Sequence, residues 1–237
     1  MNFWQGFKYV HRESWAFLLA CPLIALIPIA VEFVQHYVEM QAGMYTGTEG
    51  MRAAESDPGR MIAGYAKTLA ISLIGYSVIR FLAGNRDAAA ARTLEPRAVK
   101  LFAVIFVLQA GFSYLGLFVF EGMSTGALVL AVAGFIATPL LARFIAAAPL
   151  GIFISPQESA AQMWRQIPWA IAFSIIASLP LMIVHYALGV GAVFVPGEAI
   201  KWAMLAVDSL VVGWLAALVA ASSWVVATRK DPPESLT

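Results

Sequence analysis

The chain has 237 residues, of which 61% are hydrophobic and only 12% are charged, about half the charged fraction of an ordinary soluble domain. A formal net charge of +1 leaves no excess of either sign for binding nucleic acid, and a single cysteine excludes an internal disulfide or a multi-cysteine metal site. This composition predicts an all-α, polytopic membrane protein rather than a soluble domain.

Long apolar runs recur along the chain, and each is long enough to cross a bilayer as a helix. The predicted spans cover residues 15–37, 62–83, 99–120, 126–150, 167–190 and 199–228. We expect the whole chain, 1–237, to form one transmembrane domain with an external loop at 41–60 and a cytoplasmic tail at 229–237.

Lysine and arginine residues are distributed unequally between the two sides of these spans. Eleven lie on the side of the termini, and four lie on the other side. Short loops rich in Lys and Arg stay in the cytoplasm, so the pattern predicts that both termini are cytoplasmic. The expected location is the inner membrane of a bacterium.

The segment before the fifth span has the pattern of a helix start. Ser155 is followed by Pro156, and Glu158 lies three residues after the serine, as in a capping box. Trp164 and Arg165 follow, so a short helix at the cytoplasmic interface is predicted. Two interpretations remain open: this helix docks a partner, or it only leads into the fifth span.

The same region resembles a known family through Arg143, Pro149, Trp164 and Arg165, which occur in the family's order. It is similar to the six-span membrane domain of the YciC-like inner-membrane proteins and of some bacterial glycerophosphodiester phosphodiesterases. The resemblance implies an architecture and no activity, because this chain carries no phosphodiesterase catalytic domain.

Asp208 is the most unusual charged residue, because it lies about ten residues into the last predicted span, near the bilayer midplane. Its carboxyl group is expected to be protonated, hydrogen-bonded to a neighbour such as Gln109, or exposed to a water-filled cavity. The first two states are structural, and the third is functional.

A second polar group is predicted in the external half. Glu32 and His36 share one face of the first span with Glu39, and Lys67 begins the second span at a similar depth. A Glu32–Lys67 ion pair is the simplest interpretation. His185 can join them in a cluster able to bind a divalent metal or pass protons, although neither a metal nor a cofactor is expected from so unspecific a spacing.

Nucleotide-binding, zinc-protease and serine-hydrolase motifs are absent from the sequence, which argues against an enzyme. The leading expectation is a non-enzymatic accessory or scaffold protein of the inner membrane, or one involved with envelope lipids. The alternative is a small secondary transporter or channel-like protein with Asp208 on a polar path. The expected partners are the lipid bilayer and other membrane proteins or a second copy of the chain, but not nucleic acid.

Overall fold

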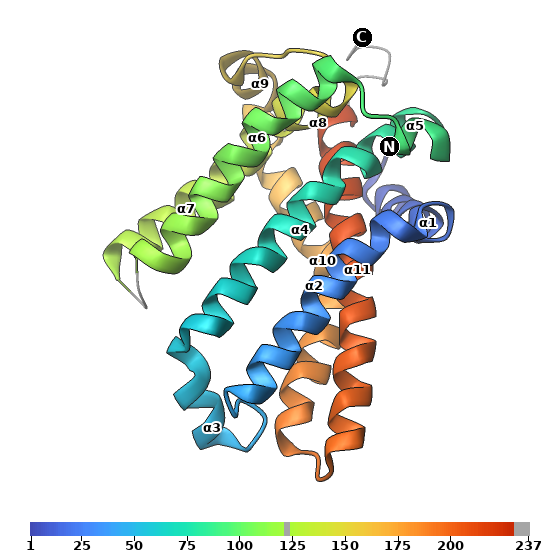
Figure 1. The fold of residues 1–237 in the computed structure, drawn as a ribbon. Coiled ribbons are helices and arrows are strands. Elements are labelled where there is room, and N and C mark those ends of the chain that lie inside the picture. The colour runs from blue at the N-terminus through green and yellow to red at the C-terminus, as the bar shows by residue number, and fades with distance from the viewer. Residues whose placement is uncertain (121–123, 230–237) are drawn as a thin grey trace.

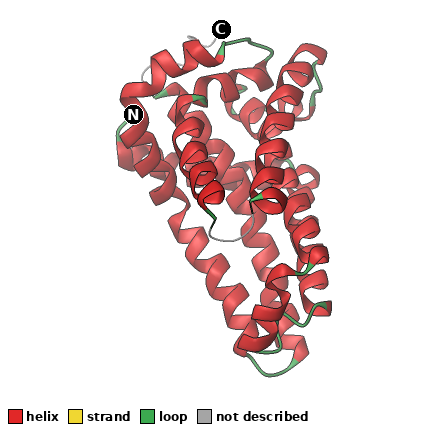
Figure 2. Cartoon of the chain, turned by 90° about the vertical axis from the view of Figure 1, so that its left-hand side faces the viewer, coloured by secondary structure: helices red, strands yellow, loops and turns green. Residues whose placement is uncertain are grey.

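The computed structural model describes residues 1–120 and 124–229, and all regular structure within these ranges is helical (Figures 1 and 2). The predicted tail lies outside the described residues except for Arg229. The elements are α1 (Phe3–Ala20), α2 (Pro22–Gln41), α3 (Thr48–Ala53), η1 (Ala54–Ser56), α4 (Pro58–Ala83), α5 (Ala88–Arg92), α6 (Pro96–Tyr114), η2 (Leu115–Val119), α7 (Thr125–Leu140), α8 (Ala142–Ala147), η3 (Ala148–Leu150), α9 (Pro156–Met163), η4 (Trp164–Gln166), α10 (Ile167–Phe194) and α11 (Glu198–Thr228).

Five helical stretches in the described part of the chain are long and apolar enough to cross a membrane: α2, α4, α6 with η2, the stretch from α9 through α10, and α11. The bent pair α7 and α8 makes a sixth if it is counted as one span. The prediction of an all-helical membrane protein with several apolar spans is confirmed. The count of six and the orientation of the termini stay predictions.

The first predicted span, 15–37, is wrong at its start. The helix breaks at Cys21 (φ −129°, ψ 54°), and α2 begins only at Pro22. Proline has no N–H to continue a helix and disfavours helical backbone in the residue before it. The apolar run that begins at Ser14 is therefore shared between α1 and α2, and the span continues to Gln41.

The fourth predicted span, 126–150, is also interrupted. Its two parts, α7 and α8, meet at an angle of 61° just after Pro139, a residue that weakens helical hydrogen bonding. Ser159 of α9 closes the break, because its hydroxyl donates to the Leu140 carbonyl (2.8 Å) and accepts from the Phe144 N–H (3.2 Å). The helix expected before the fifth span thus packs against the bend.

That short helix begins where the sequence predicts. The Ser155 hydroxyl accepts a hydrogen bond from the Glu158 N–H at 3.1 Å, which caps α9. Trp164 is exposed, and the Arg165 guanidinium lies 4.9 Å from the centre of its indole ring. An aromatic ring beside a cation at this position suits the membrane interface.

Helix α11 is the central element of the bundle and packs against α1, α2, α4 and α10 (Figure 1). Two thirds of the residues in its most apolar 18-residue stretch are buried inside the protein, whereas about a tenth are buried in the corresponding stretch of α6 with η2. Many residues of α11 are alanine, glycine or serine, small side chains that let neighbouring helices approach closely. Helices α6 and α7 form a hairpin at the edge of the molecule (Figure 1).

Arginine side chains connect separate segments of the chain at the end of the bundle that carries α1, α5, α8 and α9 (Figure 1). Arg80 donates to the carbonyls of Ala90 (2.9 Å) and Pro149 (3.0 Å). Arg92 donates to the carbonyl of Ala20 at 2.7 Å. Each bond satisfies a main-chain acceptor near the C-terminal end of a helix, where partners within the helix run out.

A bidentate ion pair adds to these contacts. Arg86 donates two 2.7 Å hydrogen bonds to the Glu13 carboxylate of α1, which is almost fully buried. The hydrogen bonds from Arg86 lower the pKa of Glu13 against the opposing effect of burial. The interaction fixes α1 against the turn between α4 and α5.

Candidate functional site

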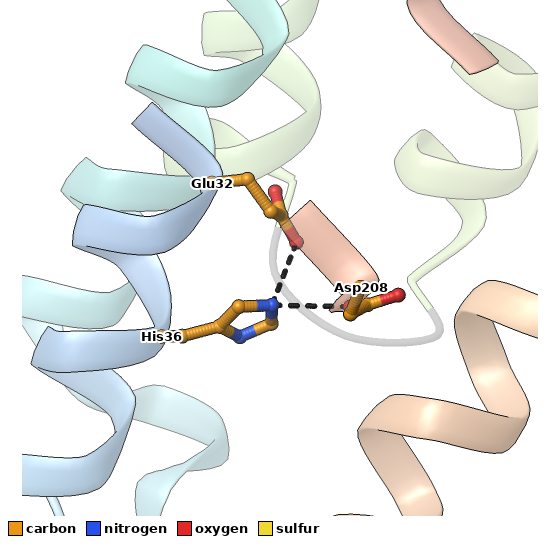
Figure 3. A group of neighbouring side chains, drawn as sticks. All are labelled: Glu32, His36 and Asp208. Carbon is orange, nitrogen blue, oxygen red and sulfur yellow. Dashed lines mark hydrogen bonds and ion pairs between the residues drawn. The ribbon is translucent and has the colours of Figure 1, made fainter. Parts of the chain in front are cut away.

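Three helices place ionisable side chains at the same depth. Glu32 lies nine residues before the end of α2, His185 nine before the end of α10, and Asp208 ten after the start of α11. At about 1.5 Å per residue, each side chain is about 13–15 Å from the end of its helix. All these helix ends lie at the end of the bundle opposite α1, so the side chains meet (Figures 1 and 3).

Asp208 lies between two histidines from different helices. Its Oδ2 is 3.0 Å from His36 Nε2, and its Oδ1 is 2.8 Å from His185 Nδ1. The aspartate is fully buried, and the side chain of His185 is 19% exposed. A buried carboxylate needs such partners, because burial without them would be strongly unfavourable.

The contacts of His36 determine which ring nitrogen carries a proton. Its Nδ1 lies 2.9 Å from the Tyr45 hydroxyl and 3.1 Å from Glu39 Oε2. The Tyr45 hydroxyl donates its only proton to Glu39 at 2.6 Å, so it can only accept from the imidazole. Nδ1 therefore carries a proton, and Nε2 is the nitrogen that faces Asp208.

Glu32 completes the group, as Figure 3 shows. Its Oε1 is 3.4 Å from His36 Nε2, and its Oε2 is 3.1 Å from the Lys67 ammonium. Its carboxylate is fully buried, and the lysine side chain is 22% exposed. The Glu32–Lys67 ion pair that the sequence suggests is present in the structure.

The positive charges paired with this cluster are fewer than its carboxylates. Glu32 is paired with Lys67, and Glu39 is paired with Arg60 at 3.3 Å. Among the described residues, the side-chain partners of Asp208 are both histidines. Neutrality at the buried site then requires one more positive charge near Asp208, supplied by a proton on a histidine or by a bound cation.

Tyr45 is a member that sequence reasoning misses. It follows α2 in a turn, yet it is 99% buried, and the Lys201 ammonium donates to its carbonyl. Burial and the neighbouring Glu39 raise the pKa of Tyr45, so it stays a hydrogen-bond donor. Gln35, which donates to Glu39 at 2.8 Å, is also missed, although its i, i+4 spacing is a usable signal.

Gln109 does not join Asp208, contrary to one of the expectations above. It lies in α6 and lines a separate cavity of about 300 Å³ with residues of α4, α7 and α8. The partners of Asp208 come instead from α2 and α10, because those helices pack against α11. The suggested Asp208–Gln109 hydrogen bond is therefore wrong.

The remaining predicted site residues lie at the other end of the protein. Arg143 is buried in α8, and the Pro149 carbonyl accepts from Arg80. Ser155 and Trp164 flank α9. These residues organise the bend and the short helices beside it, and they are separate from the histidine–carboxylate cluster (Figure 1).

Comparisons with family models, with curated proteins and with solved structures find no match. The similarity to the YciC-like family therefore rests on the four sequence positions alone. Fold and site define the class: an all-helical membrane protein with a buried cluster of two histidines and three carboxylates.

Proposed function

We propose that this chain is a multi-pass protein of the bacterial inner membrane that binds and moves a cation through the cluster around Asp208, in the manner of a small secondary transporter. One observation carries the proposal: a fully buried Asp208 is shared by His36 and His185 from two other helices. Ionisable groups are costly inside a membrane, and here they converge from three helices.

A passive scaffold does not need this arrangement. Small residues and apolar packing hold helices together without charge, and α11 is rich in both. Paired titratable groups, by contrast, allow a cation or proton to be taken up and released. The cluster therefore favours the transporter over the scaffold that composition alone suggests.

Proteoliposomes test the proposal directly. Vesicles carrying the purified chain should relax an imposed gradient of protons or of zinc ions, read by an entrapped pH dye or zinc dye. Asp208→Asn should abolish the flux while keeping the fold, because asparagine is nearly isosteric but cannot carry the charge. Gln109→Asn is the matched control, since Gln109 lines a different cavity. Absence of both fluxes, or an unchanged flux in Asp208→Asn, would refute the proposal.

The proposed orientation places both termini in the cytoplasm and α3 outside. It is supported by the excess of Lys and Arg on the side of the termini. A cysteine introduced at Gly47 should react with an impermeant reagent in whole cells, and one at Asn85 should not. The reverse pattern would invert the topology.

A role with envelope lipids is the second candidate, and one cavity favours it. A space of about 610 Å³ between α2, α4 and α6 is lined almost entirely by apolar side chains, with Arg92 at its edge. An acyl chain fits such a lining, and a guanidinium pairs with a phosphate. Native mass spectrometry should find a bound phospholipid that Arg92→Gln loses. Equal retention by both proteins would remove this candidate.

A further inference from the structure

We infer that the cation of this site is a divalent transition-metal ion of the zinc type, held by Glu32, His36 and Asp208. The inference rests on the proposed cation site and names its occupant. One ligand atom from each of the three residues lies within 4.8 Å of the other two, and all three residues are buried. One imidazole nitrogen and two carboxylate oxygens suit zinc and its neighbours better than calcium or magnesium.

Two of the distances between ligand atoms are close to those of a coordination shell, and all three atoms lie within 4.8 Å of one another. His36 Nε2 is 3.0 Å from Asp208 Oδ2 and 3.4 Å from Glu32 Oε1, and Figure 3 shows both oxygens converging on that nitrogen. Zinc bonds of about 2.0–2.2 Å in a tetrahedron separate neighbouring ligands by about 3.3–3.6 Å, so small movements of the side chains admit the ion.

A proton on His36 Nε2 would interact with these carboxylates less completely than a metal ion. One N–H at Nε2 makes a good hydrogen bond to Asp208 at 3.0 Å, but the 3.4 Å contact with Glu32 is long for a second. Glu32 Oε2 has an ion pair with Lys67 but no hydrogen bond. A dication bound between these groups interacts with both carboxylates at once.

The three proposed ligand residues also contact side chains behind them, and contacts of this kind orient metal ligands. His36 donates from Nδ1 to the Glu39–Tyr45 pair, which directs Nε2 toward the site. His185 Nδ1 lies 2.8 Å from Oδ1 and 3.0 Å from Oδ2 of Asp208, and this contact holds the carboxylate with Oδ2 also 3.0 Å from His36 Nε2. A histidine that ligates a metal usually donates its other N–H to a carboxylate in this way.

Lys67 gives the site a further property. Its ammonium is 3.1 Å from Glu32 and competes with a metal ion for that carboxylate. The Lys67 side chain is also partly exposed and can move toward water when the ion binds. A lysine in this position favours exchangeable binding over permanent binding, as a transported ion requires.

The experiment is a direct titration of the purified full chain in detergent with Zn²⁺ by calorimetry, and with Co²⁺ by visible absorption. One ion per chain is expected. His36→Gln should weaken binding by at least about 100-fold, and Glu39→Gln by about 10- to 100-fold with the stoichiometry kept, as for an outer contact. The matched control is His11→Gln, because His11 lies on α1 and bonds to the Ala177 carbonyl.

Circular dichroism and gel filtration check that each variant is folded, and Glu39→Gln keeps the test decisive if His36→Gln fails to fold. No binding by the wild type, or equal binding by wild type, His36→Gln and Glu39→Gln, overturns the metal site. If Zn²⁺ does not bind but Asp208→Asn still abolishes proton flux, the proposed function stands with a proton as its cation. If Zn²⁺ binds as expected and neither flux occurs, the metal site stands and the transport function fails.

Discussion

The ion pair between Glu32 and Lys67 is expected to act as a coupled unit in a double-mutant cycle. In Lys67→Met, the fully buried Glu32 carboxylate keeps His36, at 3.4 Å, as its close polar partner in the part of the chain that the structure describes. Removing one member of a buried pair costs about 3–5 kcal/mol, and the partial exposure of Lys67 places this change near the lower end.

The two single changes are not equivalent. Glu32→Gln removes the buried charge and leaves a lysine that can extend toward the nearer membrane interface, so we expect a loss of about 1–2 kcal/mol. The double variant strands neither charge. Its loss should be smaller than the sum of the single losses by about 1.5–3 kcal/mol.

The measurement is the free energy of unfolding of the four proteins in mixed micelles, followed by circular dichroism. Lys100→Met serves as the control, because Lys100 is exposed and its replacement should change stability by less than about 0.5 kcal/mol. A coupling energy below about 0.5 kcal/mol would show that the two residues are neighbours without a mutual contribution to stability.

Two further predictions concern other parts of the bundle. The bonds to Arg86 lower the pKa of Glu13 in the folded protein, so the contribution of Glu13 to stability is present above the ordinary pKa of 4.5 and is lost as the pH falls through the lower folded value. The difference in unfolding free energy between wild type and Glu13→Gln should therefore vanish in acid. A difference that does not depend on pH would contradict this. Gly213→Ala would place a Cβ atom 2.3 Å from Ile29 Cγ1 and should lower stability in thermal unfolding by about 1–3 kcal/mol. Gly75→Ala, whose Cβ atom would have no atom within 4 Å, should leave stability unchanged. Equal effects of the two changes would rule out close packing of α2 on α11.

Sequence reasoning predicts the apolar helices well because hydrophobicity within a bilayer is a local property of each segment. It fails at Cys21 and at the bend after Pro139, where a proline in an apolar run can mark an end, a bend or a mild kink. Only the packing of the neighbouring elements decides between these outcomes. Ser159, which closes the second break, carries no signal of that role in the sequence.

The sequence predicts the candidate site as two separate parts. Asp208 is expected at the midplane, and Glu32, His36 and His185 are expected in the external half. Counting residues from the helix ends instead puts Glu32, His185 and Asp208 at one depth, with His36 about one turn nearer the end of α2. Depth can thus be read from a sequence once the helix ends are known. The sequence does not tell which helices are neighbours, and the incorrect choice of Gln109 as a partner of Asp208 follows from that.

The two ends of the bundle are held together by different chemistry. At the end with α1, Arg80 and Arg92 donate to main-chain carbonyls, and these bonds persist at any physiological pH because a guanidinium stays charged. At the opposite end, α2, α10 and α11 are joined through His36, His185 and Asp208, whose bonds depend on protons or cations. A change of charge at that cluster therefore acts on the contacts among α2, α10 and α11, and it leaves the arginine bonds at the other end of the bundle unchanged.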